Sequence, residues 1–331
     1  MFDEPPRAVI FGCAGERLSP AEREFFATAD PLGFVVFARN CREPGQLREL
    51  IAALRDSVGR ADAPVLIDQE GGRVARLGPP HWRRYPAAAR LPDAAAARLG
   101  MRLIADDLAA MGITVDAAPV LDLPTPDADA VIGDRAYGGD LARVAALGRA
   151  ACEGLLEGGV LPIVKHIPGH GRATVDSHRA CPRVDEPRAA LAASDFAPFR
   201  ALCDMPWAMT AHVVFGAIDG EAPATLSPRV IGEVIRGEIG FGGVLVSDDL
   251  SMGALGGGLG ERTARAIAAG CDVALHCNGN AAEMAEIAEA APRLTEVALE
   301  RIARGEALRR RSRRQFDRAA AEARFAELVG E

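Results

Sequence analysis

Eight short runs of apolar and β-branched residues recur along the 331-residue chain. They begin at Ala8, Gly33, Pro64, Ile113, Leu161, Trp207, Gly243 and Val273. Longer stretches between them place Ala, Leu and Arg at helical spacing, for instance 46–58, 95–111, 141–157 and 261–269. Nearly continuous apolar runs are typical of parallel strands that are buried on both faces. Eight strand–helix repeats of this kind predict an α/β protein with a (β/α)8 TIM barrel.

No linker or low-complexity segment divides the chain, and a closed barrel of this length buries one continuous core. We therefore expect residues 1–331 to form a single TIM-barrel domain, with one or two extra C-terminal helices after Pro292. A doubly wound sheet is the alternative. The first strand–helix turn, GCAGERL, lacks the G-x-G-x-x-G phosphate-binding pattern, which disfavours that alternative.

Polar residues end almost every apolar run. They are Asp68-Gln69-Glu70, Asp122, Lys165-His166, His212, Ser247-Asp248-Asp249 and His276-Cys277-Asn278. Catalytic groups of barrel enzymes gather at the carboxyl ends of the strands, so this pattern predicts one polar site at the barrel mouth. The Pro- and Arg-rich stretch Pro79–Pro92 is expected to be a loop that lines one side of that mouth.

The charge balance and the cysteines limit the partners and the compartment. A net charge of −8 disfavours nucleic acid as a partner, and the arginines between 309 and 314 are expected on a solvated helix face. The sequence shows neither a secretory signal nor an apolar segment long enough to span a membrane. Seven scattered cysteines are expected to be reduced and mostly buried thiols. These features favour a cytoplasmic protein.

The segment KHIPGHGRATVDSHRACP, from Lys165 to Pro182, is the densest group of reactive side chains. Asp176 lies two residues before His178, close enough to orient and charge-stabilise its imidazole. His166, His170 and His178 could instead serve as metal ligands or bond to loop backbone. Their spacing matches no H-x-H or H-E-x-x-H pattern, so we expect no metal.

Two further motifs bring carboxylates to strand ends. In VSDDLSMGAL, neighbouring side chains of a strand point to opposite faces, so we expect only one of Asp248 and Asp249 to enter the site. The other should face the helices or cap the next turn. In LIDQEGGRVARL, Asp68 precedes a Gly-Gly turn after which Arg73 or Arg76 can return over the site. Such an Asp–Arg pair suits sugar hydroxyls, and a surface ion pair at the turn is the less favoured alternative.

These motifs, together with VIGDRAYG around Arg135, match a known family. KHIPGHG followed by DSH, with IDQEGGRV, IGDRAYG and VSDDLSMGAL, resembles glycoside hydrolase family 3 and its short, single-domain bacterial β-N-acetylglucosaminidases. The resemblance runs in the same order from Ala8 to about Gly279. Ala136-Tyr137 stand where relatives often have Ser-Phe, a departure that leaves Arg135 in place.

The resemblance implies an activity and residue roles. It implies a retaining exo-β-N-acetylglucosaminidase without a cofactor, which removes terminal N-acetylglucosamine from muropeptides such as GlcNAc-1,6-anhydroMurNAc during cell-wall recycling. Asp248 corresponds to the nucleophile, and His178 to an acid/base paired with Asp176. Residues that match the sugar-binding positions are Asp68, Arg76, Arg135, Lys165 and His166. No role for His170 carries over.

Several questions stay open at this point. A β-glucosidase, a metal-dependent amidohydrolase on the same barrel, and an inactive sugar-binding module are the alternatives. The intact Asp248, Asp176 and His178 disfavour the last. We expect a monomer, although no feature of the sequence fixes the oligomeric state or decides between water and phosphate as the acceptor.

Overall fold

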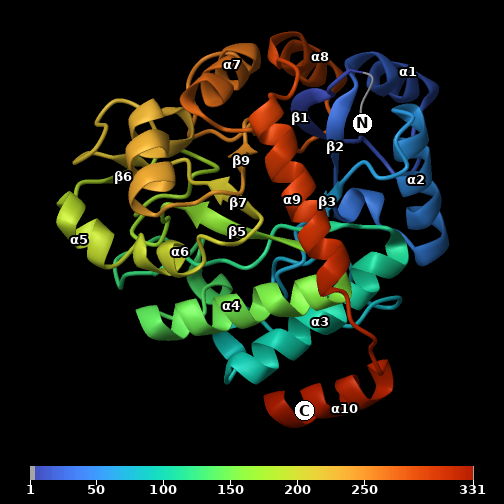
Figure 1. The fold of residues 1–331 in the computed structure, drawn as a ribbon, viewed down its shortest axis with the longest axis horizontal. Helices are drawn as coiled ribbons and strands as arrows, with labels where there is room; N and C mark the ends of the chain where they lie inside the picture. The colour runs from blue at the N-terminus through green and yellow to red at the C-terminus, as the bar shows by residue number, and fades with distance from the viewer. Residues whose placement is uncertain (1–3, 331) are drawn as a thin grey trace.

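The computed structural model describes residues 4–330, in which eight parallel strands close into a barrel surrounded by helices (Figure 1). Met1–Asp3, part of the N-terminal segment considered above, and Glu331 lie outside the described residues. The barrel strands are β1 (Arg7–Gly12), β2 (Pro31–Val36), β3 (Val65–Ile67), β4 (Val115–Asp116), β5 (Leu161–Ile167), β7 (Trp207–Thr210), β9 (Val244–Asp249) and β10 (Val273–His276). Each predicted apolar run contains or overlaps one of them.

Closure of the sheet decides between the two predicted architectures. The order around the ring is β1-β10-β9-β7-β5-β4-β3-β2, and β1 pairs in parallel with both β10 and β2. A doubly wound sheet would leave two free edges, so the TIM-barrel prediction is confirmed.

Helices follow the barrel strands as predicted. They are α1 (Pro20–Ala29), α2 (Pro44–Ser57), α3 (Ala94–Met111), α4 (Leu141–Gly158), α5 (Arg188–Ala193), α6 (Ala197–Ala201), a π-helix (Val230–Glu238), α7 (Leu259–Ala269) and α8 (Ala281–Ala290). Short 3-10 turns lie at Ala38–Asn40, Ala88–Arg90, Gly133–Arg135 and Ala224–Leu226. The side chain of Asp93 caps the start of α3, and Gly112, with φ 88°, ends it.

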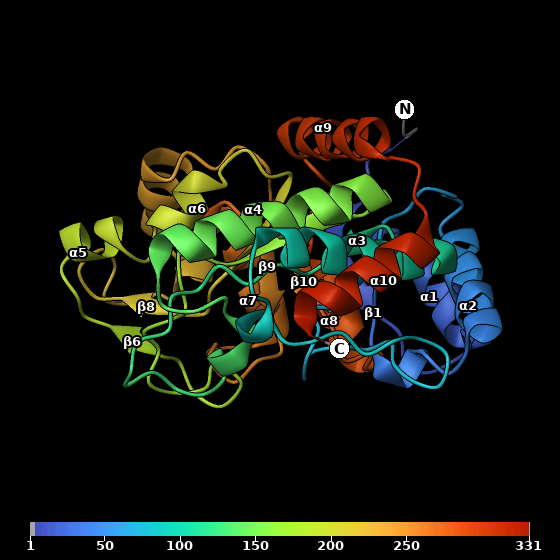
Figure 2. The same ribbon diagram turned by 90° about the horizontal axis from the view of Figure 1, so that it is seen from below.

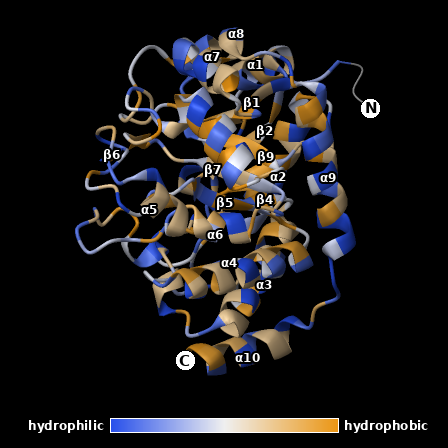
Figure 3. Cartoon of the chain, turned by 60° about the vertical axis from the view of Figure 1, so that its left-hand side comes forward, coloured by the Kyte–Doolittle hydropathy of each residue, from blue (hydrophilic) through white to orange (hydrophobic). Residues whose placement is uncertain are grey.

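The core has two layers because successive strand residues point to opposite sides. In β1, Ala8 and Ile10 belong to the cluster that fills the barrel, whereas Val9 and Phe11 belong to the cluster between the barrel and the helices. Figure 3 shows the apolar strands at the centre and mixed polar and apolar helices around them. This burial on both faces is what the continuous apolar runs predict.

The tail after Pro292 forms α9 (Glu296–Ser312) and α10 (Arg318–Val329). Helix α9 covers the amino ends of the strands, where Arg301 pairs with Asp272 and Arg304 donates to the Gly242 carbonyl. Figure 2 shows α9 on one side of the barrel and long loops on the other. Helix α9 therefore does not cover the carboxyl ends of the strands.

The arginine run at the end of α9 is only partly solvated. Arg310, Arg311, Arg313 and Arg314 are exposed, as predicted. Arg309 is instead half-buried, because it donates to the Gly159 carbonyl and pairs with Glu306.

A two-stranded parallel sheet of β6 (Arg183–Val184) and β8 (Val214–Phe215) joins the long loop after β5 to the segment after β7. The described residues contain no helix that is both long and apolar enough to cross a membrane. All seven cysteines are free thiols, but only Cys13, Cys152 and Cys271 are fully buried, fewer than predicted.

Candidate active site

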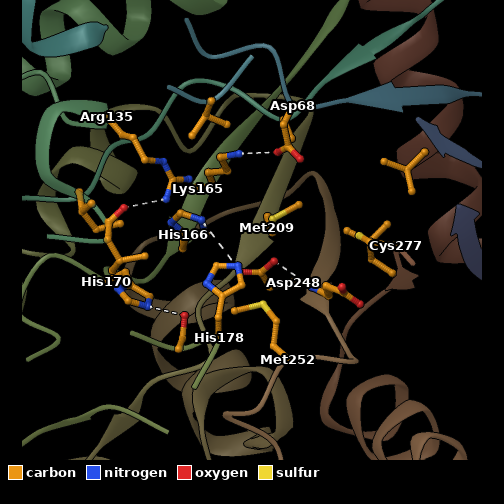
Figure 4. Close-up of a pocket in the computed structure, with 18 of the residues that line it drawn as sticks. Asp68, Arg135, Lys165, His166, His170, His178, Met209, Asp248, Met252 and Cys277 are labelled. Atoms are coloured by element: carbon orange, nitrogen blue, oxygen red, sulfur yellow. Dashed lines mark hydrogen bonds and ion pairs between the residues drawn. The ribbon is translucent and has the colours of Figure 1, made fainter. Parts of the chain in front are cut away.

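The carboxyl ends of the strands surround a cavity of about 330 Å³ (Figure 4). All eight candidate residues line it: Asp68, Arg76, Arg135, Lys165, His166, Asp176, His178 and Asp248. Residues separated by up to 180 positions thus meet because parallel strands deliver their ends to one face of the barrel.

The loop Pro79–Pro92 does not line the cavity, and that expectation is wrong. Its residues pack behind the Gly-Gly turn after β3: a Cβ on Gly72 would lie 2.6 Å from the Ala87 Cβ. The loop therefore fixes the turn from outside. Val74 and Arg76, which follow the turn, line the cavity instead.

A buried ion-pair network forms the floor of the cavity. Lys165, which is 2% exposed, places Nζ 2.8 Å from Asp68 Oδ1 and 2.7 Å from Glu70 Oε1. Arg135 donates two hydrogen bonds of 2.8 Å to Glu70. Burial would raise the pKa of both carboxyls, yet the Lys165 ammonium holds the pKa of each below its usual range. Lys165 thus keeps both acids ionised, helped by Arg76 at Asp68 and by Arg135 at Glu70.

Glu70 is a functional residue that sequence reasoning missed. It belongs to the quoted IDQEGGRV motif, but no local pattern pairs it with a lysine 95 positions away. Without Glu70 the guanidinium of Arg135 would have no carboxylate partner at this depth.

The structure separates the two arginines that the sequence left as alternatives. Arg76 donates to Asp68 Oδ2 at 3.1 Å and stacks over the Phe37 ring, 5.0 Å from its centroid. Arg73 lies at the rim and pairs with Asp134. Arg76 is the one that faces the floor, through its pair with Asp68.

Asp122 is a second residue that sequence reasoning left without a role. It is fully buried and accepts hydrogen bonds from the His166 backbone N–H (3.2 Å), from His166 Nδ1 (2.7 Å) and from the His170 N–H (2.7 Å). These bonds keep the pKa of Asp122 low despite its burial. With Nδ1 engaged, His166 turns Nε2 to the cavity, 4.0 Å from Asp248 Oδ2.

Both aspartates at the end of β9 reach the cavity, contrary to the expectation that only one would. The register between β9 and β10 shifts here by one residue, so strict alternation of side chains is lost. Asp249 also caps the following turn through Ser251 N (3.0 Å) and Oγ (2.8 Å), as predicted for one of the pair.

Asp248 has the environment of an ionised carboxylate. Its burial would raise the pKa, but the facing rings of His166 and His212 and the Asp249 N–H at 2.8 Å lower it. Apart from that N–H, the structure gives it no hydrogen bond from another residue within the described chain. One carboxylate oxygen is therefore available to an incoming molecule.

The loop after β5 brings a histidine–aspartate pair over the cavity. His178 Nδ1 lies 2.8 Å from Asp176 Oδ1, which also accepts the His178 backbone N–H at 2.9 Å. Burial by itself would raise the pKa of Asp176, but these two bonds and the Arg179 charge together lower it below its ordinary value. In Figure 4 the His178 ring faces the cavity beside Asp248. Among the described residues, none forms a hydrogen bond with Nε2 of His178, which leaves this nitrogen open.

The three loop histidines line the same cavity but share no polar partner. Their nearest polar partners are Asp122 for His166, Ser177 for His170 and Asp176 for His178. Within residues 4–330 no group of three or more His, Cys, Asp or Glu side chains is arranged to hold a metal ion. The chemistry offered by this chain is that of an ionised carboxylate, an aspartate-supported imidazole and a floor of paired charges.

Comparisons with known proteins show the family of the chain. The model of the glycosyl hydrolase family 3 N-terminal domain matches residues 15–307. A β-hexosaminidase of Alkalilimnicola ehrlichii is 40% identical over 284 residues, which cover 82% of this chain and 80% of that protein.

Two solved structures extend the likeness to three dimensions. One is NagZ from Neisseria gonorrhoeae in complex with N-trifluoroacetyl-D-glucosamine, with a TM-score of 0.87, 31% identity and coverage of 98% of this chain and 99% of that one. The other is a family 3 β-N-acetylglucosaminidase from a Paenibacillus strain, with a TM-score of 0.85, 33% identity and coverage of 97% and 67%. From fold, site and likeness together, the chain belongs to glycoside hydrolase family 3 and is a glycoside hydrolase.

Proposed function

We propose that this enzyme is a retaining exo-β-N-acetylglucosaminidase that forms a covalent glycosyl-enzyme on Asp248. The single observation that carries the proposal is the meeting of a low-pKa Asp248 carboxylate and the His178–Asp176 pair in one cavity with a charged floor. A retaining glycosidase needs a nucleophile on one side of the anomeric carbon and a proton carrier near the leaving oxygen.

In the first step Asp248 attacks the anomeric carbon, and the bond from that carbon to the leaving oxygen breaks. The imidazolium of His178 carries one proton on Nδ1, bonded to Asp176, and delivers the other from Nε2 to the departing oxygen. The negative charge of Asp176 stabilises the imidazolium before transfer.

In the second step the now neutral His178 takes a proton on Nε2 from a water molecule, which attacks the same anomeric carbon and releases Asp248. Two inversions at that carbon give net retention. Histidine suits both roles, because its reference pKa of about 6.5 lies near neutral pH.

The floor of the cavity supports recognition of one terminal sugar. Asp68 offers acceptors to sugar hydroxyls, while Arg76, Lys165 and Arg135 are donors already held in place by their ion pairs. His166 Nε2 adds a donor or acceptor beside Asp248. A cavity closed by this floor favours removal of a terminal residue over cleavage within a chain.

The proposed substrates are muropeptides that carry terminal N-acetylglucosamine, such as GlcNAc-1,6-anhydroMurNAc. We propose that the enzyme acts on them in the cytoplasm during cell-wall recycling, as a monomer made of one domain. Support comes from the β-hexosaminidase relative and from the NagZ structure that holds N-trifluoroacetyl-D-glucosamine. Without a carboxylic acid in the acid/base position, phosphate could also act as an acceptor, which product analysis in phosphate buffer would decide.

The deciding experiment compares turnover of nitrophenyl β-N-acetylglucosaminide with that of the matching glucoside. We expect preference for the former and a β-configured product at early times by NMR. Preference for the glucoside would make the chain a β-glucosidase. An α-configured first product would exclude the retaining mechanism.

A further inference from the structure

His170 takes no part in the steps above, yet it is one of the most constrained side chains near the cavity. It is 3% exposed, its backbone N–H donates to Asp122, and its ring centre lies 5.6 Å from that of His166. Its Nε2 lies 3.0 Å from Ser177 Oγ, and Ser177 is also 3% exposed. A buried pair of polar side chains therefore connects the start of the loop to its catalytic end.

Ser177 stands between Asp176 and His178 in the sequence. Its backbone carbonyl accepts the Ala254 N–H at 3.1 Å, and the His178 carbonyl accepts the Gly253 N–H at 3.3 Å. Both donors belong to the turn that follows β9, the strand that carries Asp248. The position of His178 relative to Asp248 thus depends on how this short segment is held.

The two ends of the loop are fixed differently. Near β5, Gly171 packs so tightly that a Cβ would overlap the Leu123 carbonyl. Farther along, the segment around Asp176 is half-exposed, and the Ser177 side chain is its one fully buried anchor besides Ala173 among the described residues 172–179. Loss of that anchor would leave the catalytic segment on the two backbone hydrogen bonds to the β9 turn.

The protonation of His170 gives the bond a direction. Burial, with the neighbouring His166, lowers the pKa of His170 to about 4, so the ring is neutral at pH 7. Nδ1 has no hydrogen-bond partner among the described residues. An unpaired acceptor is tolerated inside proteins better than an unpaired N–H, which places the proton on Nε2, donated to Ser177 Oγ.

We propose that His170 is a positioning residue: its bond to Ser177 latches the Asp176–His178 segment and sets the place of the acid/base relative to Asp248. The proposal rests on the proposed function, because it assigns a role in the same reaction. The latch acts through His178, so its loss should slow the steps that need a proton carrier and spare attack by Asp248.

Three variants test the latch. His170→Leu and Ser177→Ala remove the bond, whereas His170→Gln can place an amide N–H near the position of Nε2. The matched control is His81→Leu, an exposed histidine of the loop that packs outside the cavity. Thermal unfolding of each variant shows that it is folded at the assay temperature.

The loss of one neutral hydrogen bond predicts a fall in disaccharide kcat of about fivefold to tenfold in His170→Leu and in Ser177→Ala. His170→Gln should recover most of it. The pre-steady-state burst with a nitrophenyl glycoside should stay within about twofold of the parent, because that leaving group needs no acid. Azide is an anionic nucleophile that needs no base. It should therefore raise the steady-state rate of the latch variants on the nitrophenyl glycoside and yield a β-glycosyl azide.

The proposal is overturned if both removal variants keep the parent kcat on the disaccharide. It is also overturned if the burst falls as much as the disaccharide rate and azide gives no acceleration, since His170 would then support binding or the nucleophile. Amide exchange of residues 172–182 gives a readout independent of turnover: faster exchange in Ser177→Ala supports the latch, and unchanged exchange excludes it. If the parent hydrolyses no N-acetylglucosaminide, the proposed function fails and exchange alone decides the latch.

Discussion

At the scale of single residues, the cavity is a place where burial and charge are balanced. Asp68, Glu70, Asp122 and Asp248 are all in or below the cavity, and the pKa of each is lowered although burial acts the other way. Each stays ionised because cations, imidazoles or N–H donors face it. Among these four described carboxylates, Asp248 alone combines a lowered pKa with an oxygen left open, which supports the proposal that it is the nucleophile.

Asp248→Asn should reduce turnover by on the order of 10³-fold or more, because an amide cannot form the glycosyl-enzyme. Asp249→Asn should remain competent, with lower stability from the weakened turn cap. Steady-state rates check both variants. A 5-fluoro N-acetylglucosaminyl inactivator followed by peptide mapping should label Asp248, and a label on Asp249 or on a loop histidine would refute the assignment.

His178→Ala should cost about 10²–10⁴-fold in the glycosylation rate of a disaccharide and far less with a nitrophenyl glycoside. The reason is that a sugar alkoxide needs a proton to leave and a nitrophenolate does not. Asp176→Asn should follow the same pattern more weakly, since it alters the charge and orientation of the ring without removing it. Equal losses in the pre-steady-state rates of both substrates would show that His178 only binds substrate.

At the scale of elements, the strand ends carry the ionisable side chains, and the surrounding elements shift the pKa values of those side chains. Strand β4 is only two residues long, yet it ends in Asp116, a fully buried carboxyl whose Oδ1 accepts the Gln69 N–H while Oδ2 has no partner within the described chain. Burial raises the pKa of Asp116 to about 7. This carboxyl differs from its neighbours because it lacks a direct cationic partner.

Asp116→Asn tests this environment through pH. A raised pKa means that the folded state binds the proton more tightly, so this contribution to stability is complete below about pH 4 and is lost as pH rises through about 7. Asparagine imitates the protonated acid at every pH. The free energy of unfolding of the variant relative to the parent should therefore increase by on the order of 2–4 kcal/mol between pH 4 and pH 8. Urea unfolding at three pH values measures it, and parallel curves would show that Asp116 is ionised throughout.

Helix α10 contributes stability away from the chemistry. Phe325 is fully buried and meets α3 at Gly100, where a Cβ would lie 2.9 Å from its ring. Phe325→Ala should lower the free energy of unfolding by about 3–5 kcal/mol with kcat unchanged below the unfolding transition. Val297→Ala, at a position 52% exposed, is the control and should change stability by less than about 0.5 kcal/mol. A kcat loss in Phe325→Ala at low temperature would contradict this separation of stability from catalysis.

At the scale of the whole molecule, the two ends of the barrel have different structures. Helix α9 lies across the amino ends of the strands, with long loops on the opposite side (Figure 2). Arg304 and Arg309 of α9 donate to carbonyls just before the strands, and the cavity lies at the carboxyl ends. Stability and catalysis can therefore be altered independently, as the paired predictions for Phe325 and Asp248 assume.

Activity should survive exhaustive treatment with EDTA, since the loop histidines each bond to a different partner. The check is the rate of nitrophenyl β-N-acetylglucosaminide hydrolysis before and after dialysis against the chelator. Loss of that rate with recovery on addition of Zn²⁺ would favour the metal-dependent amidohydrolase alternative.

The sequence by itself determined the eight strand–helix repeats, because burial on both faces leaves a continuous apolar run that is visible in one dimension. It also placed Asp68, Lys165 and Asp248 at strand ends, and closure of the barrel then brings such ends together whatever their separation along the chain. The resemblance of the motifs to the family implied which of these residues is the nucleophile and which bind the sugar.

Only the tertiary structure decided which side chains pair. Lys165 pairs with both Asp68 and Glu70, and Asp122 accepts hydrogen bonds from two histidines. His170 bonds to Ser177. All these contacts depend on strand register and on loop packing between distant segments. The register shift in β9 likewise overrode the alternation that predicted a single aspartate in the cavity. Local sequence carries no record of such distances, since each is set by the whole closed barrel.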